Sequence, residues 1–268
     1  NSIKIIGDNT DMYAQAYFDY DSKKSGGVTM SHLRFGKKPI KSTYLIHKAN
    51  FVACHNPSYV NKYNMVQELV DGGTFLLNCA WDMEGLEKHL PGQVKAFIAN
   101  HNIKFYTIDG VKIGIETGMG PTRINTILQS AFFKLTGIIP EDQAIDLMKA
   151  AAKATYGRKG DDVVQKNWAA IDAGAKQVVE IQVPESWKNA EDEGLHMTHA
   201  TEGRQDVIDF VNNIQAKVNA QEGNSLPVSA FKDYVDGTTP SGSSAYEKRG
   251  IAVNVPVWNV DNCIQCNF

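Results

Sequence analysis

Short segments in the first part of the chain alternate apolar with polar residues or are apolar throughout, and both patterns predict β-strands. Between the later segments, apolar residues recur at helical spacing, which predicts helices over residues 57–70 and 86–98. The run Asp71-Gly72-Gly73 is expected to end the first of these helices. Strands that alternate with helices are typical of an α/β domain with a parallel sheet. The predicted strands cover residues 13–20, 28–35, 50–54, 74–79 and 104–108.

Beyond residue 118 the pattern becomes helical. Residues 124–135 are apolar on nearly every face, which fits either core burial or dimerisation. Further helices are expected over 140–155, where acidic residues follow Pro140, and over 161–179. From about residue 184 the composition shifts toward Pro, Glu, Asn and Gly, which predicts an arm without a large core of its own. The fold class is therefore α/β: a parallel-sheet domain with a helical C-terminal part, followed by an extended linker arm.

Composition excludes several classes of protein. Hydrophobic residues make up 43% and charged residues 21% of the 268 residues, which is typical of globular proteins. A formal net charge of −3 argues against a dedicated nucleic-acid binder, and no apolar run has the length of a membrane span. Cys54 and Cys79 lie in apolar segments, so a reduced, cytoplasmic protein is expected.

Several motifs in one collinear order resemble the pyruvate:ferredoxin (flavodoxin) oxidoreductases. The segment YEKRGIA at 246–252, then VPVW at 255–258 and the C-x-x-C pair Cys263 and Cys266, resembles the Glu-Lys-Arg linker that precedes a two-cluster ferredoxin domain in this family. The segments NSIKIIG at 1–7, GVTMSHLRFG at 27–36 and GPTRINT at 120–126 resemble the gamma-type domain of the same enzymes. The resemblance covers essentially the whole chain.

The resemblance implies a division into a gamma-type domain at 1–199, a Glu-Lys-Arg linker domain at 200–257 and the truncated start of a 4Fe-4S ferredoxin domain at 258–268. It implies that the whole enzyme converts pyruvate to acetyl-CoA with thiamine diphosphate, Mg²⁺, three 4Fe-4S clusters and CoA. The parent is expected to be a homodimer that passes electrons to ferredoxin or flavodoxin. This chain is expected to be a piece of that enzyme, inactive alone and in contact with its remaining domains, with no catalytic residue and no cofactor of its own.

A cluster of hydroxyl and basic residues suits a phosphorylated ligand. A solvated basic loop is the alternative interpretation. The gamma-type domain is implicated in holding CoA in the family, and the resemblance therefore makes this cluster a candidate CoA site. The family's Gly-rich loop, expected just before Asn1, is missing, so the site would be incomplete. The candidate residues are Thr29, Ser31, His32, Arg34, Lys37, Lys38, Lys41 and Arg123; for Arg123 the alternative is an interface salt bridge.

Taken alone, the C-x-x-C pair fits a zinc half-site, a redox dithiol or a ferredoxin start. With the linker in front of it, the resemblance implies that Cys263 and Cys266 are 4Fe-4S ligands in the full-length enzyme and are empty here, since two thiolates supply half of such a set. His55, His196 and His199 lack the partners of a catalytic or metal site and are expected to be structural.

A free-standing nucleotide-binding or scaffold module of the same fold is the alternative to a piece of an enzyme. A dinucleotide-dependent dehydrogenase is not supported, because no G-x-G-x-x-G follows a predicted strand.

Overall fold

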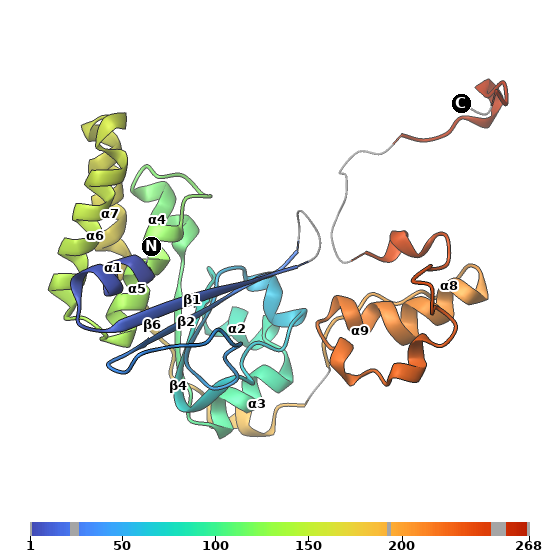
Figure 1. The fold of residues 1–268 in the computed structure, drawn as a ribbon, viewed down its shortest axis with the longest axis horizontal. Helices are drawn as coiled ribbons and strands as arrows, with labels where there is room; N and C mark the ends of the chain where they lie inside the picture. The colour runs from blue at the N-terminus through green and yellow to red at the C-terminus, as the bar shows by residue number, and fades with distance from the viewer. Residues whose placement is uncertain (1, 22–26, 192–193, 248–255, 267–268) are drawn as a thin grey trace. The chain divides into compact units, whose positions relative to one another are not determined.

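The computed structural model describes residues 2–21, 27–191, 194–247 and 256–266 (Figure 1). The chain divides into two compact units, one made of Asn1–Asp19 with Met30–His196 and the other of Tyr20–Thr29 with Met197–Phe268. The helices of the first unit are α1 (Ser2–Asn9), α2 (Met83–His89), α3 (Gly92–Asn100), α4 (Gly110–Glu116), α5 (Asn125–Thr136), α6 (Glu141–Tyr156) and α7 (Asp161–Lys176). The strands are β1 (Tyr13–Tyr20), β2 (Thr29–Gly36), β3 (Ala49–Cys54), β4 (Leu69–Asn78), β5 (Lys104–Ile108) and β6 (Val179–Glu180).

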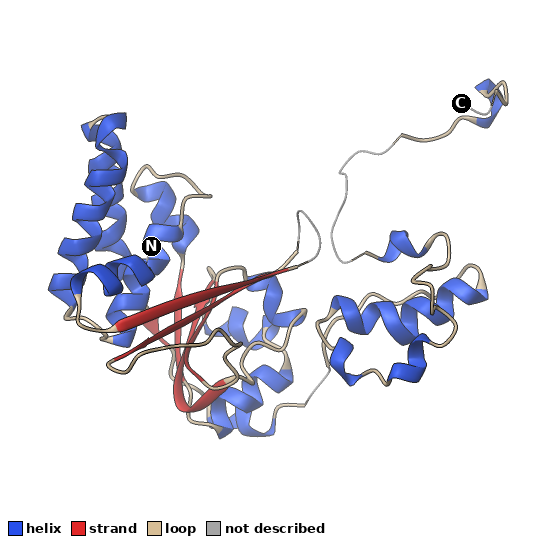
Figure 2. Ribbon diagram, viewed as in Figure 1, coloured by secondary structure: helices blue, strands red, loops and turns tan. Residues whose placement is uncertain are grey.

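A four-stranded sheet in the order β3-β4-β5-β6 forms the centre of the first unit, and β1 and β2 form a separate two-stranded sheet (Figure 2). Strands β3, β4 and β5 pair in parallel, which confirms the predicted parallel sheet. The short strand β6 pairs antiparallel with β5, through Tyr106 opposite Glu180 and Thr107 opposite Val179. The helix predicted over 161–179 therefore ends earlier, at Lys176, and the chain turns back to the sheet.

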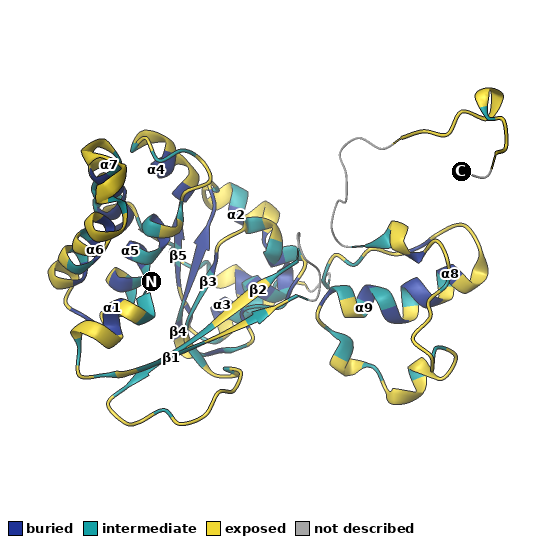
Figure 3. Ribbon diagram, turned by 45° about the horizontal axis from the view of Figure 1, so that its top comes forward, coloured by how far each residue is buried: buried dark blue, intermediate teal, exposed yellow. Residues whose placement is uncertain are grey.

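Alternating side chains of β4 give the sheet two apolar faces. Phe75 and Leu77 point into a core shared with α2 and α3, whereas Leu76 points into one shared with α4, α5 and α7. A third cluster joins α1 to α5, α6 and α7. The outer sides of α6 and α7 are exposed (Figure 3). Helix α5 lies between these layers, so the apolar character of residues 124–135 is explained by core burial.

The prediction of a helix over residues 57–70 is wrong. A 3-10 turn at Pro57–Asn61 is all that forms, and Leu69 already belongs to β4, where it is opposite Ala49. The Gly72-Gly73 pair does not end a helix. It lies inside β4 at an irregularity in the register, where Gly72 has φ +71° and a side chain on Gly73 would meet the Val70 carbonyl at 2.8 Å.

The longest helical segment in the described part of the second unit covers residues 205–219 and comprises α8 (Gln205–Phe210), a π-helical turn (Val211–Gln215) and α9 (Ala216–Asn219). The core of this unit is small: Ala200, Val207, Phe210, Val211 and Ile214 are buried. Composition predicts no large core for this region, but it did not predict the helix. No helix in the described residues is long and apolar enough to cross a bilayer.

Candidate functional site

Strand β2 divides the predicted ligand-binding residues between its two faces. Side chains alternate along a strand, so His32 and Arg34 share one face, whereas Thr29 and Ser31 share the other with Phe35. The Phe35 ring centroid lies 6.2 Å from that of Phe132 on α5. At the C-terminal end of β2, this second face is therefore directed toward helix α5. The hydroxyls and the basic groups of β2 therefore do not form one cluster.

The Arg34 guanidinium is occupied by the chain that follows β2. Its Nη1 donates to the Ser42 carbonyl oxygen at 3.4 Å and its Nη2 donates to the Tyr44 carbonyl oxygen. The guanidinium carbon also lies 3.4 Å from the centroid of the Tyr44 ring, which adds a cation–π contact. In this conformation both terminal nitrogens of Arg34 donate to carbonyl groups of the protein itself, so the guanidinium does not offer this pair of N–H donors to a ligand.

His32 contacts the same segment two residues further along, at Ile46. The Ile46 amide donates to His32 Nδ1 at 3.1 Å, so this nitrogen is the unprotonated acceptor and the proton of the neutral ring lies on Nε2. Desolvation lowers the pKa of His32. The ring centroid of Tyr17 on β1 lies 6.5 Å away. His32 is therefore a neutral hydrogen-bond acceptor.

The lysines that the sequence singles out remain in solvent. Lys37, Lys38 and Lys41 are exposed, and they follow β2 directly. Arg123 is exposed in the turn ahead of α5, and no hydrogen bond or ion pair among the described residues joins it to β2. The structure thus leaves the lysines available to an anion, while Arg34 and His32 face their own loop.

Asn78, a residue that the sequence reasoning missed, ties together the carboxyl ends of the three parallel strands. Its side chain is buried, donating to the His55 carbonyl oxygen after β3 and accepting from the Gly110 amide after β5, both at 2.9 Å. A side chain on Gly110 would meet Asn78 Oδ1 at 2.9 Å, so glycine is required there. The only signal in the sequence was a polar residue within an apolar run.

Burial shifts the pKa values of two cysteines and one histidine at this edge. Burial raises the pKa of Cys54 to about 12 and raises the pKa of Cys79 as well, so both stay protonated thiols at neutral pH. Desolvation lowers the pKa of His55. His196 and His199 are exposed.

The C-x-x-C pair directly follows a short 3-10 turn. Asn259 Oδ1 accepts from the amides of Asp261 and Asn262 at the start of the 3-10 turn Val260–Asn262. Hydrogen bonds from the Trp258 side chain and then from the Gln265 backbone lower the pKa of Cys263. Cys266 is exposed. Lys248 and Arg249 of the Glu-Lys-Arg motif lie outside the described residues.

Thiolates that accept N–H bonds are suitable ligands for an iron–sulfur cluster. However, the described ranges contain no group of three or more His, Cys, Asp or Glu side chains placed to hold a metal ion. Cys263 and Cys266 therefore fit part of a cluster site, and further ligands would have to come from elsewhere.

Comparison with known proteins agrees with this fold. The chain is 53% identical over its whole length to a pyruvate-flavodoxin oxidoreductase of Enterobacter agglomerans and 52% identical to the pyruvate:ferredoxin oxidoreductase of Moorella thermoacetica. It spans 22% of the length of each. The crystal structure of the pyruvate oxidoreductase subunit PORC of Thermotoga maritima shares the fold with a TM-score of 0.51 at 16% identity, covering 68% of this chain and 87% of that one.

Two family models match two successive parts of the chain. Residues 198–252 match EKR, a domain of unknown function. Residues 2–177 match the family described as pyruvate ferredoxin/flavodoxin oxidoreductase, and this match includes strands β1 to β5 and helices α1 to α7. The chain therefore belongs to the pyruvate ferredoxin/flavodoxin oxidoreductase family.

Proposed function

We propose that this chain is the gamma-type part of an enzyme that oxidatively decarboxylates pyruvate to acetyl-CoA and passes the electrons through iron–sulfur clusters to ferredoxin or flavodoxin. The observation that carries the proposal is the 53% identity, over the whole chain, to a relative named for pyruvate and flavodoxin. Thiamine diphosphate and Mg²⁺ would be bound by the remaining domains of the same enzyme. The assembled enzyme would be a cytoplasmic homodimer.

Within that enzyme, we assign two contributions to this chain: CoA binding and contacts with the neighbouring domains. CoA is rich in phosphate, and the exposed lysines after β2 offer charges that phosphate oxygens accept well. Thr29 and Ser31 are exposed and add hydroxyls on the opposite face of the strand. Arg34 could contact a phosphate only by releasing Ser42 and Tyr44, so direct contact falls to the lysines, with Arg123 as a separate candidate.

For the iron–sulfur chemistry, Cys263 and Cys266 would supply two ligands of a 4Fe-4S cluster. Such a cluster transfers single electrons when it is bound. In this chain, Trp258 and the backbone of Gln265 would hold the Cys263 sulfur by hydrogen bonds, and Asn259 would fix the turn that precedes both cysteines.

Combined replacement of Lys37 and Lys41 by alanine in the full-length enzyme is expected to raise the Michaelis constant for CoA about 10-fold to 100-fold, as loss of a charged hydrogen bond does. Reduction of the clusters by pyruvate without CoA should remain near its original rate. Stopped-flow spectroscopy of the clusters and steady-state turnover measure the two quantities. Lys176→Ala, which removes an exposed lysine at the end of α7, is the control and should change neither. Equal loss of CoA-independent reduction in the double variant would contradict a role in CoA binding.

A further inference from the structure

The segment between β2 and β3, residues 37–48, forms neither helix nor strand and is held against β2 by side chains of that strand; we call it the strap. Arg34 holds the carbonyls of Ser42 and Tyr44, and His32 holds the amide of Ile46. Few apolar contacts add to these bonds, because Tyr44 is 59% and Leu45 38% exposed. Polar contacts therefore hold the strap on the strand: the bonds from His32 and Arg34, the cation–π contact of Arg34 with Tyr44, and an exposed contact of His47 with Glu68 at 3.4 Å.

We propose that Arg34 and neutral His32 act as a latch that closes the strap over β2, and that protonation of His32 opens it. Both are positioning residues: they set where Lys37, Lys38 and Lys41 stand. The consequence for CoA rests on the function proposed above, whereas the latch itself does not.

Two buried donors without acceptors lower the stability of the closed strap, as a switch requires. Arg34 Nε and His32 Nε2 are buried nitrogens without a hydrogen-bond partner among the described residues. A buried donor without an acceptor has lost its hydrogen bonds to water and gained none in return. The free energy of this desolvation offsets part of the stabilisation that the three latch bonds give to the closed strap. We expect opening of the strap to let water reach these donors. Closed and open states are thus close enough in free energy for a single proton to shift their populations.

Protonation of His32 acts directly on one latch bond. A proton on Nδ1 removes the acceptor that Ile46 N–H needs, and it places a cation beside the Arg34 guanidinium. The charged neighbours come from each element packed around the ring: Asp19 on β1 and Glu68 before β4 favour the protonated form, whereas Arg34 on β2 and His47 on the strap oppose it. Desolvation is the largest influence and opposes protonation.

The direction of the pH effect follows. In the closed state the pKa of His32 lies below its ordinary value of 6.5, so the closed state takes up the proton less readily than the open state. Closure is fully favoured above about pH 6.5. It weakens as the pH falls from there through the lowered pKa.

Amide hydrogen exchange in this chain tests the latch, with protection factors corrected for the intrinsic effect of pH. The Ile46 amide should lose about tenfold protection between pH 7.5 and pH 5, whereas the amide of Phe75 in the central strand β4 should lose none.

In His32→Asn an amide oxygen can replace Nδ1 as acceptor without titrating, so protection of Ile46 should not depend on pH. Arg34→Lys keeps the positive charge but lacks the two guanidinium nitrogens that bond the Ser42 and Tyr44 carbonyls together. Protection should then fall several-fold at every pH, and trypsin should cleave faster after Lys41.

The full-length enzyme provides the second readout. Arg34→Lys should raise the Michaelis constant for CoA. In the wild type this constant should rise as the pH falls from 7.5 to 6, and His32→Asn should reduce that rise. Protection of Ile46 that is independent of pH in the wild type would overturn the latch and leave the proposed function untouched. An Arg34→Lys variant with an open strap and an unchanged Michaelis constant for CoA would overturn the positioning role. Failure of the lysine variants alone would instead count against the proposed function.

Discussion

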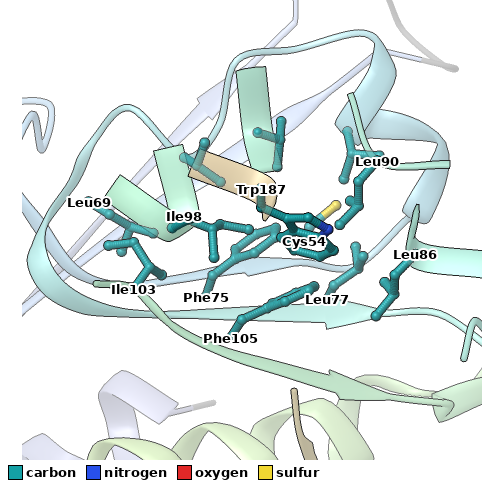
Figure 4. Close-up of a cluster of buried hydrophobic side chains, with 14 of the residues drawn as sticks. Cys54, Leu69, Phe75, Leu77, Leu86, Leu90, Ile98, Ile103, Phe105 and Trp187 are labelled. Carbon is teal, nitrogen blue, oxygen red and sulfur yellow. The ribbon is translucent and has the colours of Figure 1, made fainter. Parts of the chain in front are cut away.

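Replacing Trp187 with alanine is expected to lower the free energy of unfolding of the α/β unit by about 3–5 kcal/mol. Trp187 is 1% exposed and lies among Phe75, Leu77 and Phe105, with its ring centroid 6.3 Å from that of Phe105 (Figure 4). Its indole N–H donates to Glu87 Oε2 at 2.5 Å. The substitution would leave a large cavity and remove this bond. Urea denaturation followed by far-UV circular dichroism measures the loss.

Trp258→Ala is the matched control for this experiment. Trp258 is 70% exposed and belongs to the second unit, so the stability of the α/β unit should change by less than about 0.5 kcal/mol. Trp187→Phe should fall between the two, because the phenyl ring fills part of the space but makes no bond to Glu87. A Trp187→Ala protein as stable as Trp258→Ala would show that the segment Glu185–Asn189 is not part of the core.

Replacing Gly174 with alanine should destabilise the packing of α5 against α7 by about 2 kcal/mol, in spite of alanine's higher helix propensity. A side chain at Gly174 would lie 2.5 Å from the carbonyl oxygen and 2.9 Å from the Cα of Ile127. These are backbone atoms, so no rotamer change relieves the clash and the helices must separate. The hydrogen bond of Ser130 to the Ile171 carbonyl oxygen, 2.6 Å long, spans the same interface and would lengthen. Thermal denaturation measures the net effect.

Gly157→Ala offers the opposite expectation with the same chemical change. Gly157 ends α6 with φ −55° and ψ −34°, and a side chain there would meet no atom within 4 Å. Alanine should therefore be neutral or stabilise the protein by up to about 1 kcal/mol. If both glycine variants melted alike, close contact between α5 and α7 would not be what limits residue size at Gly174.

The sequence was a reliable guide where one local pattern decides the structure. Residues 104–108 form β5, and the acidic residues after Pro140 begin α6 as predicted. It misled over residues 57–70, because Tyr63, Val66 and Leu69 have helical spacing but are buried by a loop and by the start of β4. The Gly72-Gly73 pair fits a helix end and a strand irregularity equally well. Only pairing with β3, which is a long-range contact, distinguishes the two.

For the candidate site, residue type was predictable but orientation was not. Thr29, Ser31, His32 and Arg34 are close in sequence, yet the strand period places them on two faces. That Arg34 would turn to the Ser42 and Tyr44 carbonyls depends on how the strap folds back, and no periodicity encodes this. Asn78 had no motif around it. The CoA and cluster assignments stay predictions until the ligands are tested.

The antiparallel strand β6 has a consequence for the order of folding. Its partner β5 precedes it by the whole of α4, α5, α6 and α7, so their pairing closes a long loop whose entropy is recovered only after those helices have packed. We therefore expect β6 to join the sheet last. Until then the outer edge of β5 is unpaired, and a strand of another molecule could pair with it.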